Sequence, residues 1–321
     1  MKALVRERYG FDALEVRDIP MPTPADDEVL VRVCAGSVNP ADWYDVKGMV
    51  AARVMSRALL KPKEIRVGTD LAGRVEAVGA KVTKFKPGDD VFGARNGALA
   101  AYVTVPEGRA IALKPSNVSF EEAAGVAIAG ITALQGLRDK ANVQPGQKVL
   151  INGASGGVGT FAVQIAKVLG AHVTAVCSTQ NVDIARSLGA DRVIDYTRED
   201  FTREDVRYDV FFDVAGSRTW RDSRRVLKPD GIFVMVGAPK THPLRHLAKI
   251  LIVGKTSRRH KIVFFVAKLT GHDMNVMREL LENGKVKTIV DRRYDLEDAT
   301  EAFRYLGVGH TQGKVVVTLG A

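Results

Sequence analysis

A glycine-rich loop between an apolar strand and an amphipathic helix places the strongest limit on the fold of this chain. The loop is INGASGGVG, residues Ile151–Gly159, and it directly follows the apolar residues of KVL. Beyond it, apolar residues recur at helical spacing, at Val158, Phe161, Ala162, Ile165, Ala166 and Leu169. The pattern predicts a strand, a tight turn and a helix N-terminus, where free backbone N–H groups and the helix dipole favour an anion.

The glycines Gly153, Gly156 and Gly159 of this loop stand three residues apart. A side chain at such positions would obstruct the turn, the approach of a pyrophosphate or the contact between helix and strand. A tight turn without a ligand is the alternative. The loop nevertheless lies in a complete strand–helix–strand unit with three more predicted strands after it, so we predict a dinucleotide site.

Strands and helices alternate after the loop. The segments KVLING, HVTAVCS, RVIDY, DVFFDVAG and GIFVMVG read as strands, and VGTFAVQIAKVLG, NVDIARSLG and TWRDSRRVL read as helices between them. This alternation predicts a parallel sheet with right-handed crossovers, whose strands are buried on both faces. Residues 121–140, which are rich in small side chains, predict a helical segment before the sheet.

The chain before Pro115 and after Gly284 has a different pattern. Short strands alternate with turns in ALVRE, EVLVRVCAG, RVEAVG, DVFG and AAYVTVP, and KPGD at residues 86–89 marks a turn. After Gly284 the chain reads as a strand (VKTIVDRRY), a helix (LEDATEAFRYLG) and a strand (GKVVVTLG). We predict a barrel-like β domain to which this C-terminal tail returns.

Composition and charge narrow the class of protein. The chain has 321 residues, of which 46% are hydrophobic and 26% charged, as expected for a packed fold of two domains. No apolar run approaches the ~20 residues that span a bilayer, and the N-terminus lacks a secretory segment, so a cytoplasmic location is expected. The net charge is +10, but residues 240–261 hold seven Lys or Arg and no acid, which leaves 10 − 7 = +3 elsewhere. No specific nucleic-acid partner is therefore expected.

The residues after the second predicted strand decide which dinucleotide fits. NAD-binding folds usually carry an acidic residue there, and this chain has the sequence CSTQN at residues 177–181. Ser178 and Asn181 accept a 2′-phosphate without repulsion, and Tyr196 at the end of the third strand reaches the same region. We therefore predict NADPH. Three cations are candidates for the missing positive charge: Arg192, Arg198 and Lys314.

The motifs VLINGASGGVGTFAVQIAK and SLGADRVIDY resemble the zinc-free quinone oxidoreductase branch of the medium-chain dehydrogenase/reductase family. SVNPADW, GTDLAGRVEAVG, KPGDDVFG, AGITALQGL and GKVVVTL extend the resemblance over nearly the whole chain. The chain is similar to the reticulon-4-interacting-protein and chloroplast-envelope quinone-oxidoreductase-like reductases and to the alkenal/enone reductases. The resemblance implies an α/β fold in which a Rossmann NADP-binding domain, residues 119–283, is inserted into a GroES-like catalytic domain, residues 1–118 and 284–321.

Zinc-binding members of this family carry Cys, His and Cys ligands at three motif positions. Here those positions are Asn39, Thr69 and Ile128, and an isoleucine cannot ligate a metal. The four-cysteine zinc lobe is missing too, since the chain has two cysteines, which are expected to be buried thiols. His242 and His246 are four residues apart but have no acidic or cysteine neighbour in their segment. We therefore expect no metal site.

Without a metal, the anion left by hydride transfer to an enone or quinone needs a hydrogen-bond donor or a proton. The resemblance places Asn39 near the nicotinamide as a donor, Tyr44 as a proton source or substrate contact, and Thr132 beside the nicotinamide. The alternatives are a turn residue, a packed aromatic side chain and a helix threonine bonded to its own turn. Asp42 and Asp70 also match motif positions, and we interpret them as hydrogen-bonding scaffold residues.

The resemblance also implies a set of contacts with NADPH. The expected residues are Ser155, Gly156, Gly157 and Val158 at the pyrophosphate, Val214 and Ala215 under the adenosine and ribose, and Gly237, Ala238, Phe264, Phe265 and Val266 around the nicotinamide. The turn His310-Thr311-Gln312 stands where the family has an HARGK-like sequence before the last strand. Thr-Gln replaces Ala-Arg in this turn, so one phosphate-facing arginine is lost, which bears on cofactor affinity more than on cofactor identity.

Three functions remain open at this point. The first is an NADPH-dependent, zinc-independent reductase of quinones or α,β-unsaturated carbonyls, the second an enoyl-thioester reductase, and the third a non-catalytic NADPH-binding interaction or nucleic-acid-binding protein. The strand KIVFFVAK is expected at a sheet edge that a second subunit covers in a homodimer. The basic segment 240–261 is interpreted as a solvated surface on the dimer side, with weak binding to a membrane surface as the alternative.

Overall fold

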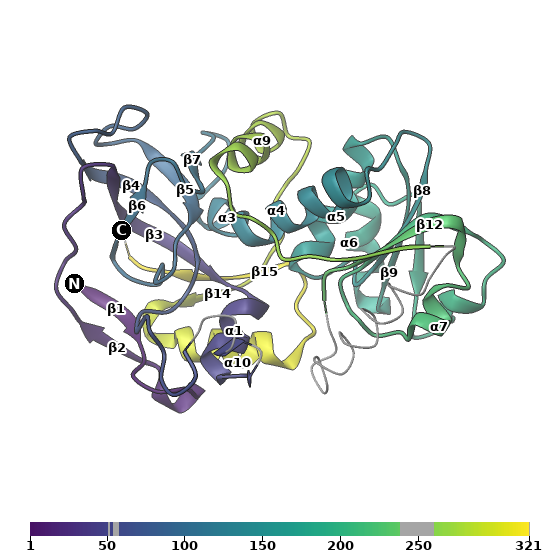
Figure 1. The fold of residues 1–321 in the computed structure, drawn as a ribbon, viewed down its shortest axis with the longest axis horizontal. Helices are drawn as coiled ribbons and strands as arrows, with labels where there is room; N and C mark the ends of the chain where they lie inside the picture. Colours follow the sequence, from purple (N-terminus) through teal and green to yellow (C-terminus); the bar gives the residue numbers. More distant parts are fainter. Residues whose placement is uncertain (51, 54–57, 238–259, 321) are drawn as a thin grey trace. The chain divides into compact units, whose positions relative to one another are not determined.

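The computed structural model of this chain describes residues 1–50, 52–53, 58–237 and 260–320, which form two compact units (Figure 1). The first unit comprises Met1–Ile131 and Lys268–Ala321, and the second comprises Thr132–Ala267. Ala238, His242, His246 and the basic segment up to residue 259 lie outside the described residues. Within the described residues, no helix combines the length and apolarity needed to cross a bilayer.

A seven-stranded sheet forms the first unit, in the order β14-β15-β3-β4-β5-β7, with β6 paired to β3. Its strands are β3 (Glu28–Val38), β4 (Asp70–Val78), β5 (Asp90–Ala94), β6 (Tyr102–Pro106), β7 (Ile111–Leu113), β14 (Val290–Asp295) and β15 (Lys314–Thr318). Strand β15 pairs antiparallel with β3, so the C-terminal tail returns to the N-terminal strands as the sequence predicts. A separate two-stranded sheet joins β1 (Lys2–Val5) to β2 (Glu15–Asp18).

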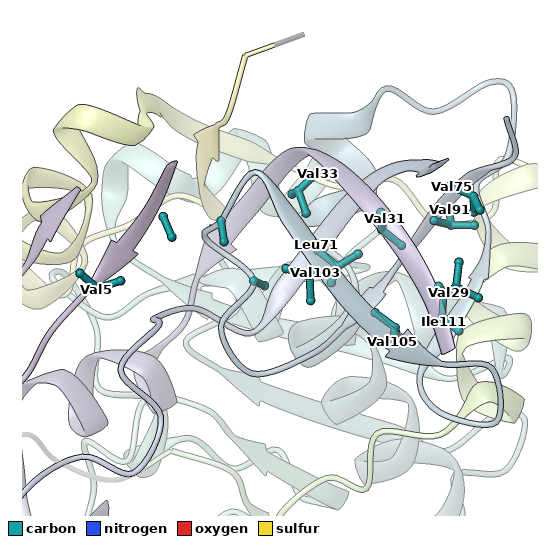
Figure 2. Packing of buried hydrophobic residues seen from close by; sticks show 13 residues of the cluster. Val5, Val29, Val31, Val33, Leu71, Val75, Val91, Val103, Val105 and Ile111 are labelled. Atoms are coloured by element: carbon teal, nitrogen blue, oxygen red, sulfur yellow. The ribbon is translucent and has the colours of Figure 1, made fainter. Parts of the chain in front are cut away.

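Alternation along the longest strand builds the core of this sheet. Val29, Val31 and Val33 of β3 are each at most 1% exposed, because every second residue of a strand faces the same side. They pack with Leu71 of β4 and with apolar residues of β5, β6 and β7. Figure 2 shows these side chains gathered between the strands. The period-two pattern of EVLVRV therefore specifies the interior of the barrel-like unit.

The helices of the first unit include α1 (Pro40–Lys47), α3 (Phe120–Ala124), α9 (Gly271–Glu282) and α10 (Ala299–Val308). Helix α1 begins with Asn39 and Asp42 as a capping box, with Pro40 in its first turn, and its C-cap Gly48 is left-handed. Because α1 follows β3 directly, it carries the SVNPADW motif from the sheet into a helix.

Six parallel strands form the sheet of the second unit, in the order β10-β9-β8-β11-β12-β13. The strands are β8 (Lys148–Asn152), β9 (His172–Cys177), β10 (Arg192–Asp195), β11 (Tyr208–Asp213), β12 (Leu227–Met235) and β13 (Lys261–Phe264). The central side chains Leu150, Phe211 and Phe233 are at most 1% exposed, which agrees with a sheet buried on both faces. Helices α5 (Gly157–Val168) and α6 (Val182–Ser187) connect β8, β9 and β10.

Some predicted elements are shorter than the sequence pattern suggested. The helix predicted over TWRDSRRVL is limited to α7 (Trp220–Ser223), because the chain extends into β12 from Leu227. The strand predicted from Val286 begins at Val290. The helical segment 121–140 is divided into α3, α4 (Ala127–Gln135) and a π-helical turn, with Gly125 ending α3.

The core of the first unit gives a first prediction. Replacing Leu71, which is fully buried, with alanine leaves a cavity and should lower the free energy of unfolding by about 2–5 kcal/mol. The control is Leu60→Ala, since Leu60 is 94% exposed. Chemical denaturation of both variants measures the difference; equal stabilities would contradict the packing described here.

Candidate functional site

The nucleotide loop joins β8 to α5 through two glycines with distinct roles. Gly153 has φ +81°, a left-handed conformation that favours glycine. A Cβ at Gly159 would lie 2.0 Å from the carbonyl oxygen of Gly153, so the first turn of α5 can pack this closely only with glycine there. The sequence INGASGGVG therefore dictates both the turn and the contact of helix with strand.

The same loop leaves space where a phosphate group would lie. A Cβ added to Gly156, the N-cap of α5, would meet a single atom within 4 Å, the Gly153 oxygen at 3.7 Å. Helix α5 is twelve residues long. As in any α-helix, the N–H groups of its first turn have no hydrogen-bond partner within the helix. Ser155 precedes this position and is 9% exposed. The residues Ser155–Val158 thus fit a pyrophosphate at a helix N-terminus.

The other predicted cofactor residues of the second unit meet at one edge of its sheet. Each follows or ends a parallel strand, so all lie at the carboxyl ends, where ligands bind in open α/β sheets. These residues are Ser178 after β9, Tyr196 after β10, Val214 and Ala215 after β11, Gly237 after β12, and Phe264, Phe265 and Val266 at the end of β13. Tyr196, Phe264 and Val266 are 46%, 37% and 62% exposed, and so have surface left for a ligand.

The buried carboxyl group of Asp213, which the sequence did not single out, connects two strand ends at this edge of the sheet. The Asp213 Oδ1, at the end of β11, accepts hydrogen bonds from the Asn152 side chain and the Gly216 N–H, both at 2.9 Å. Asn152 also accepts from the Val214 N–H at 2.9 Å. Burial raises the pKa of Asp213 to about 6. Asp213 thus ties the end of β8 to the turn after β11, and the signal for it was an acid ending the apolar run DVFFD.

A carboxylate that was not expected from the sequence, that of Asp195, lies beside the loop after β9. Ser178 accepts a hydrogen bond from the Asn181 amide at 3.0 Å. Beside it, Asp195 Oδ2 accepts from the Thr179 hydroxyl at 2.5 Å, because Asp195 of β10 stands opposite Cys177 of β9. This hydrogen bond is the main cause that lowers the pKa of Asp195. The loop after β9 has no acid of its own, as the sequence shows, but its neighbour supplies one.

The three cations proposed for a 2′-phosphate have different surroundings. Arg192 donates to Glu204 at 2.9 Å. Arg198 is 75% exposed and pairs with Asp195 at 3.4 Å, so its charge lies near the loop after β9 but is shared with that carboxylate. Lys314 belongs to the first unit, where it is buried and paired.

A buried polar cluster in the first unit contains Asn39 and Lys314. The Asn39 side-chain amide donates to Asp42 Oδ2 at 3.2 Å and to Asp70 Oδ2 at 3.0 Å, and its oxygen accepts from the Lys314 ammonium. Lys314 also lies 3.3 Å from Asp70 Oδ2. The four side chains are 7% exposed or less. The Asn39 amide nitrogen therefore donates to two carboxylates, whereas the family resemblance places it near the nicotinamide as a donor.

Asp70 is the most highly coordinated member of this cluster. Besides Asn39 and Lys314, it accepts from the Ser37 hydroxyl at 2.9 Å and from the Ile128 N–H at 3.0 Å. Strands β3, β4 and β15 and helix α4 all contribute to it. The scaffold role predicted for Asp70 agrees with these contacts.

Asp42 stands next to Asp70 but has a different environment. Its Oδ1 accepts from the Thr69 hydroxyl at 2.6 Å, and its Oδ2 accepts from the Asn39 N–H at 3.0 Å. Burial raises the pKa of Asp42 to about 6, and the nearby Asp70 charge contributes in the same direction. Asp42 is thus both the third residue of the α1 capping box, of which Asn39 is the N-cap, and a carboxyl group whose pKa is raised.

The remaining predicted residues are placed as follows. The Tyr44 ring stands edge-on to Trp43, with centroids 5.5 Å apart, and burial raises the pKa of its phenol. Thr132 is 9% exposed in α4. The backbone N–H of Gln312, in the turn 310–312, donates to Asp291 at 2.9 Å. The structure therefore brings Asn39 into the cluster, whereas Tyr44 is in the neighbouring apolar packing of α1.

The three positions that hold zinc ligands in other members have no ligand set here. Asn39 and Thr69 donate to carboxylates, and Ile128 contributes its backbone N–H to Asp70. In the part of the chain that the structure describes, no three His, Cys, Asp or Glu side chains form a group that could hold a metal ion. The lysine-centred cluster occupies this region of the fold instead.

Known proteins resemble this chain over its whole length. Residues 25–116 match the family described as alcohol dehydrogenase GroES-like domain, and residues 188–317 match the family described as zinc-binding dehydrogenase. The chain is 32% identical to the chloroplastic quinone-oxidoreductase QR1 of Triphysaria versicolor, over 99% of this chain and 98% of the relative. It is 34% identical to the chloroplastic NADPH-dependent alkenal/one oxidoreductase of Arabidopsis thaliana, over 99% of this chain and 79% of the relative.

A solved structure, the quinone oxidoreductase from Coxiella burnetii, superposes with a TM-score of 0.87 at 28% identity and covers 99% of both chains. This chain belongs to the medium-chain dehydrogenase/reductase family. Its relatives also include a trans-enoyl reductase of Aspergillus terreus, 33% identical over 94% of this chain and 90% of the relative. The protein is therefore an oxidoreductase of the quinone oxidoreductase branch, with a GroES-like domain, a Rossmann-like sheet and a nicotinamide cofactor.

The glycine loop gives a second prediction. Gly159→Ala should destabilise the protein by about 1–3 kcal/mol or more and weaken dinucleotide binding, because its Cβ would overlap the Gly153 carbonyl. Gly108→Ala is the control, since a Cβ there meets nothing within 4 Å. Thermal unfolding and cofactor titration of both variants test this; normal binding by Gly159→Ala would show that the loop can relax.

Proposed function

We propose that this protein reduces quinones or α,β-unsaturated carbonyl compounds with NADPH and without a metal. The observation that carries this proposal is the replacement of a ligand set by the buried cluster of Asn39, Asp42, Asp70 and Lys314. NADPH supplies a hydride when it is bound. The relatives named as quinone and alkenal/one oxidoreductases support this substrate class.

The residues of the chain then have to bind the cofactor and manage a proton. Reducing an alkene or quinone by hydride leaves an anion, which a donor must neutralise. Asn39, Tyr44 and Thr132 remain the proposed residues on the nicotinamide side, and the carboxyl edge of the second unit provides the proposed dinucleotide contacts. Because both Asn39 amide hydrogens are engaged, its proposed role is to hold Asp42 and Asp70 in place.

Enoyl-thioester reduction is the second candidate, and the trans-enoyl reductase relative favours it. Like an enone, an enoyl thioester has an activated carbon–carbon double bond. It differs from an enone in its acyl chain and its thioester group. A panel of 9,10-phenanthrenequinone, an acrolein-type enone and crotonyl-CoA, each with NADPH, separates the candidates. Turnover of the first two supports our proposal, preference for crotonyl-CoA supports the second candidate, and no turnover supports a non-catalytic NADPH-binding protein.

Activity without a metal is a third prediction. Extended dialysis against a chelator should leave the turnover of this panel unchanged, because Asn39, Thr69 and Ile128 do not form a ligand set. Metal analysis before and after dialysis provides the check. Stoichiometric zinc whose removal abolishes activity would contradict it.

The cofactor preference gives a fourth prediction. Ser178 follows β9 and carries no charge, while Asp195 beside it is engaged by Thr179 and Arg198. Ser178→Asp should weaken NADPH binding, because like charges placed together cost several kcal/mol. Ser187→Asp, which adds the same charge on exposed α6, is the control.

Dissociation constants for NADPH and NADH, measured for the wild type and both variants, test this cofactor preference. A wild type that uses NADH as well as NADPH would show that the interpretation of this loop is wrong. An unchanged affinity for NADPH in Ser178→Asp would mean that the 2′-phosphate binds elsewhere.

Assembly and location are also proposals. Strand β13 pairs with β12 alone among the described strands and is an edge of its sheet, so we propose a homodimer that covers it. We propose that the basic segment, of which the structure describes His260 and Lys261, is a dimer-side surface, and weak binding to anionic membranes is the alternative. We propose a cytoplasmic location for the protein.

A further inference from the structure

One residue that is hydrogen-bonded to the buried cluster is itself partly exposed. Ser37, Asn39, Asp70 and Lys314 are at most 3% exposed and Asp42 is 7% exposed. Thr69, by contrast, is partly exposed. It stands directly before β4, and its hydroxyl donates to Asp42 Oδ1 at 2.6 Å. Thr69 is therefore the partly exposed neighbour of Asp42.

The hydrogen bonds of Asp42 determine which of its oxygens can hold a proton. Oδ2 already accepts from the backbone N–H and the side-chain amide of Asn39, at 3.0 and 3.2 Å. Oδ1 accepts only from Thr69 among the described residues. A proton on Asp42 therefore goes to Oδ1 and is donated to the Thr69 oxygen. The hydroxyl hydrogen of Thr69 then points away from Asp42.

The charge balance of the cluster favours such a proton. Two carboxylates, Asp42 and Asp70, share one ammonium group, that of Lys314, and the ion pair is with Asp70 at 3.3 Å. A second buried carboxylate without its own cation is costly, so Asp42 is the member that becomes neutral. Its pKa, raised to about 6 by burial and by Asp70 and opposed by Thr69, Asn39 and Lys314, agrees with this assignment.

We propose that Thr69 and Asp42 are the proton relay of this reductase, with Thr69 as the group that protonates the reduced substrate. This proposal rests on the proposed reduction of enones or quinones. The substrate anion takes the hydroxyl hydrogen of Thr69, and the Thr69 oxygen takes the Asp42 Oδ1 proton as its bond to the first hydrogen breaks. Asp42 is left as a carboxylate and regains one proton from solvent, so each turnover consumes one hydride and one proton.

The pH dependence distinguishes this relay from a purely structural role. Asp42 must be protonated to donate, so its donor form predominates below a pH of about 6 and is lost as the pH rises through that value. The charged groups that face Asp42 are Asp70 from β4 and Lys314 from β15. A role limited to capping α1 would leave no such step in the profile of kcat.

The test compares Thr69→Val, which keeps the shape and removes the hydroxyl, with Thr69→Ser, which keeps the hydroxyl. The control is Thr318→Val, because Thr318 donates to Asp295 at 2.7 Å in the same unit. The kcat for reduction of an enone is measured from pH 5 to 9 in H2O and in D2O. The KM for NADPH and the thermal unfolding of each variant are measured as well. Asp42→Asn is measured in parallel.

Thr69→Val should lower kcat by roughly 100-fold, with KM for NADPH unchanged, and should remove both the fall in kcat near pH 6 and the solvent isotope effect. Thr69→Ser should keep the pH profile, and Thr318→Val should match the wild type. An active wild type with an unchanged profile in Thr69→Val overturns the relay while leaving the reductase function intact. A wild type that reduces no acceptor overturns the proposed function, and the relay with it.

Discussion

The ion pair between Lys314 and Asp70 is the interaction on which the first unit depends. It joins residues 244 positions apart, because β15, at the end of the chain, lies beside β3 and so reaches β4. Breaking a buried pair by removing one partner is strongly destabilising, since the other charge is left uncompensated. The chain can therefore close its first unit only if its C-terminal tail returns after the inserted second unit.

The same pair organises the neutral groups around it. Lys314 orients the Asn39 carbonyl oxygen, which leaves the Asn39 amide hydrogens for Asp42 and Asp70. Asp42 in turn caps α1 through the Asn39 N–H. Helix α1 is thus fixed by the charge cluster as well as by its own capping box, and Tyr44 on that helix is positioned indirectly by Lys314. A buried network in which the donors and acceptors are matched rigidifies its surroundings in this way.

The sequence predicts the second unit better than the first, because the patterns that mark the second unit are local along the chain. The glycine loop and the alternating strands follow from local patterns, and the family resemblance supplied most of the cofactor residues expected at the strand ends. Parallel strands present their carboxyl ends at one edge, which is where these residues lie. Asp195 was missed because it reaches the loop after β9 from the neighbouring strand through the register opposite Cys177. The cluster around Asp70 joins four distant segments, so the family resemblance could name Asn39 and Asp70, but the sequence could not place Lys314 beside them.

The substrate class that we propose agrees with the charged groups that this cluster supplies. Oxidising an alcohol requires that a hydroxyl group lose its proton before the hydride leaves, and a metal ion favours the resulting alkoxide. Reducing an activated alkene or quinone requires the reverse: a proton delivered to an anion that forms after hydride transfer. A group of two carboxylates and one ammonium, whose side chains are 7% exposed or less, is suited to storing that proton. The charge balance of this cluster therefore agrees with the reduction that we propose.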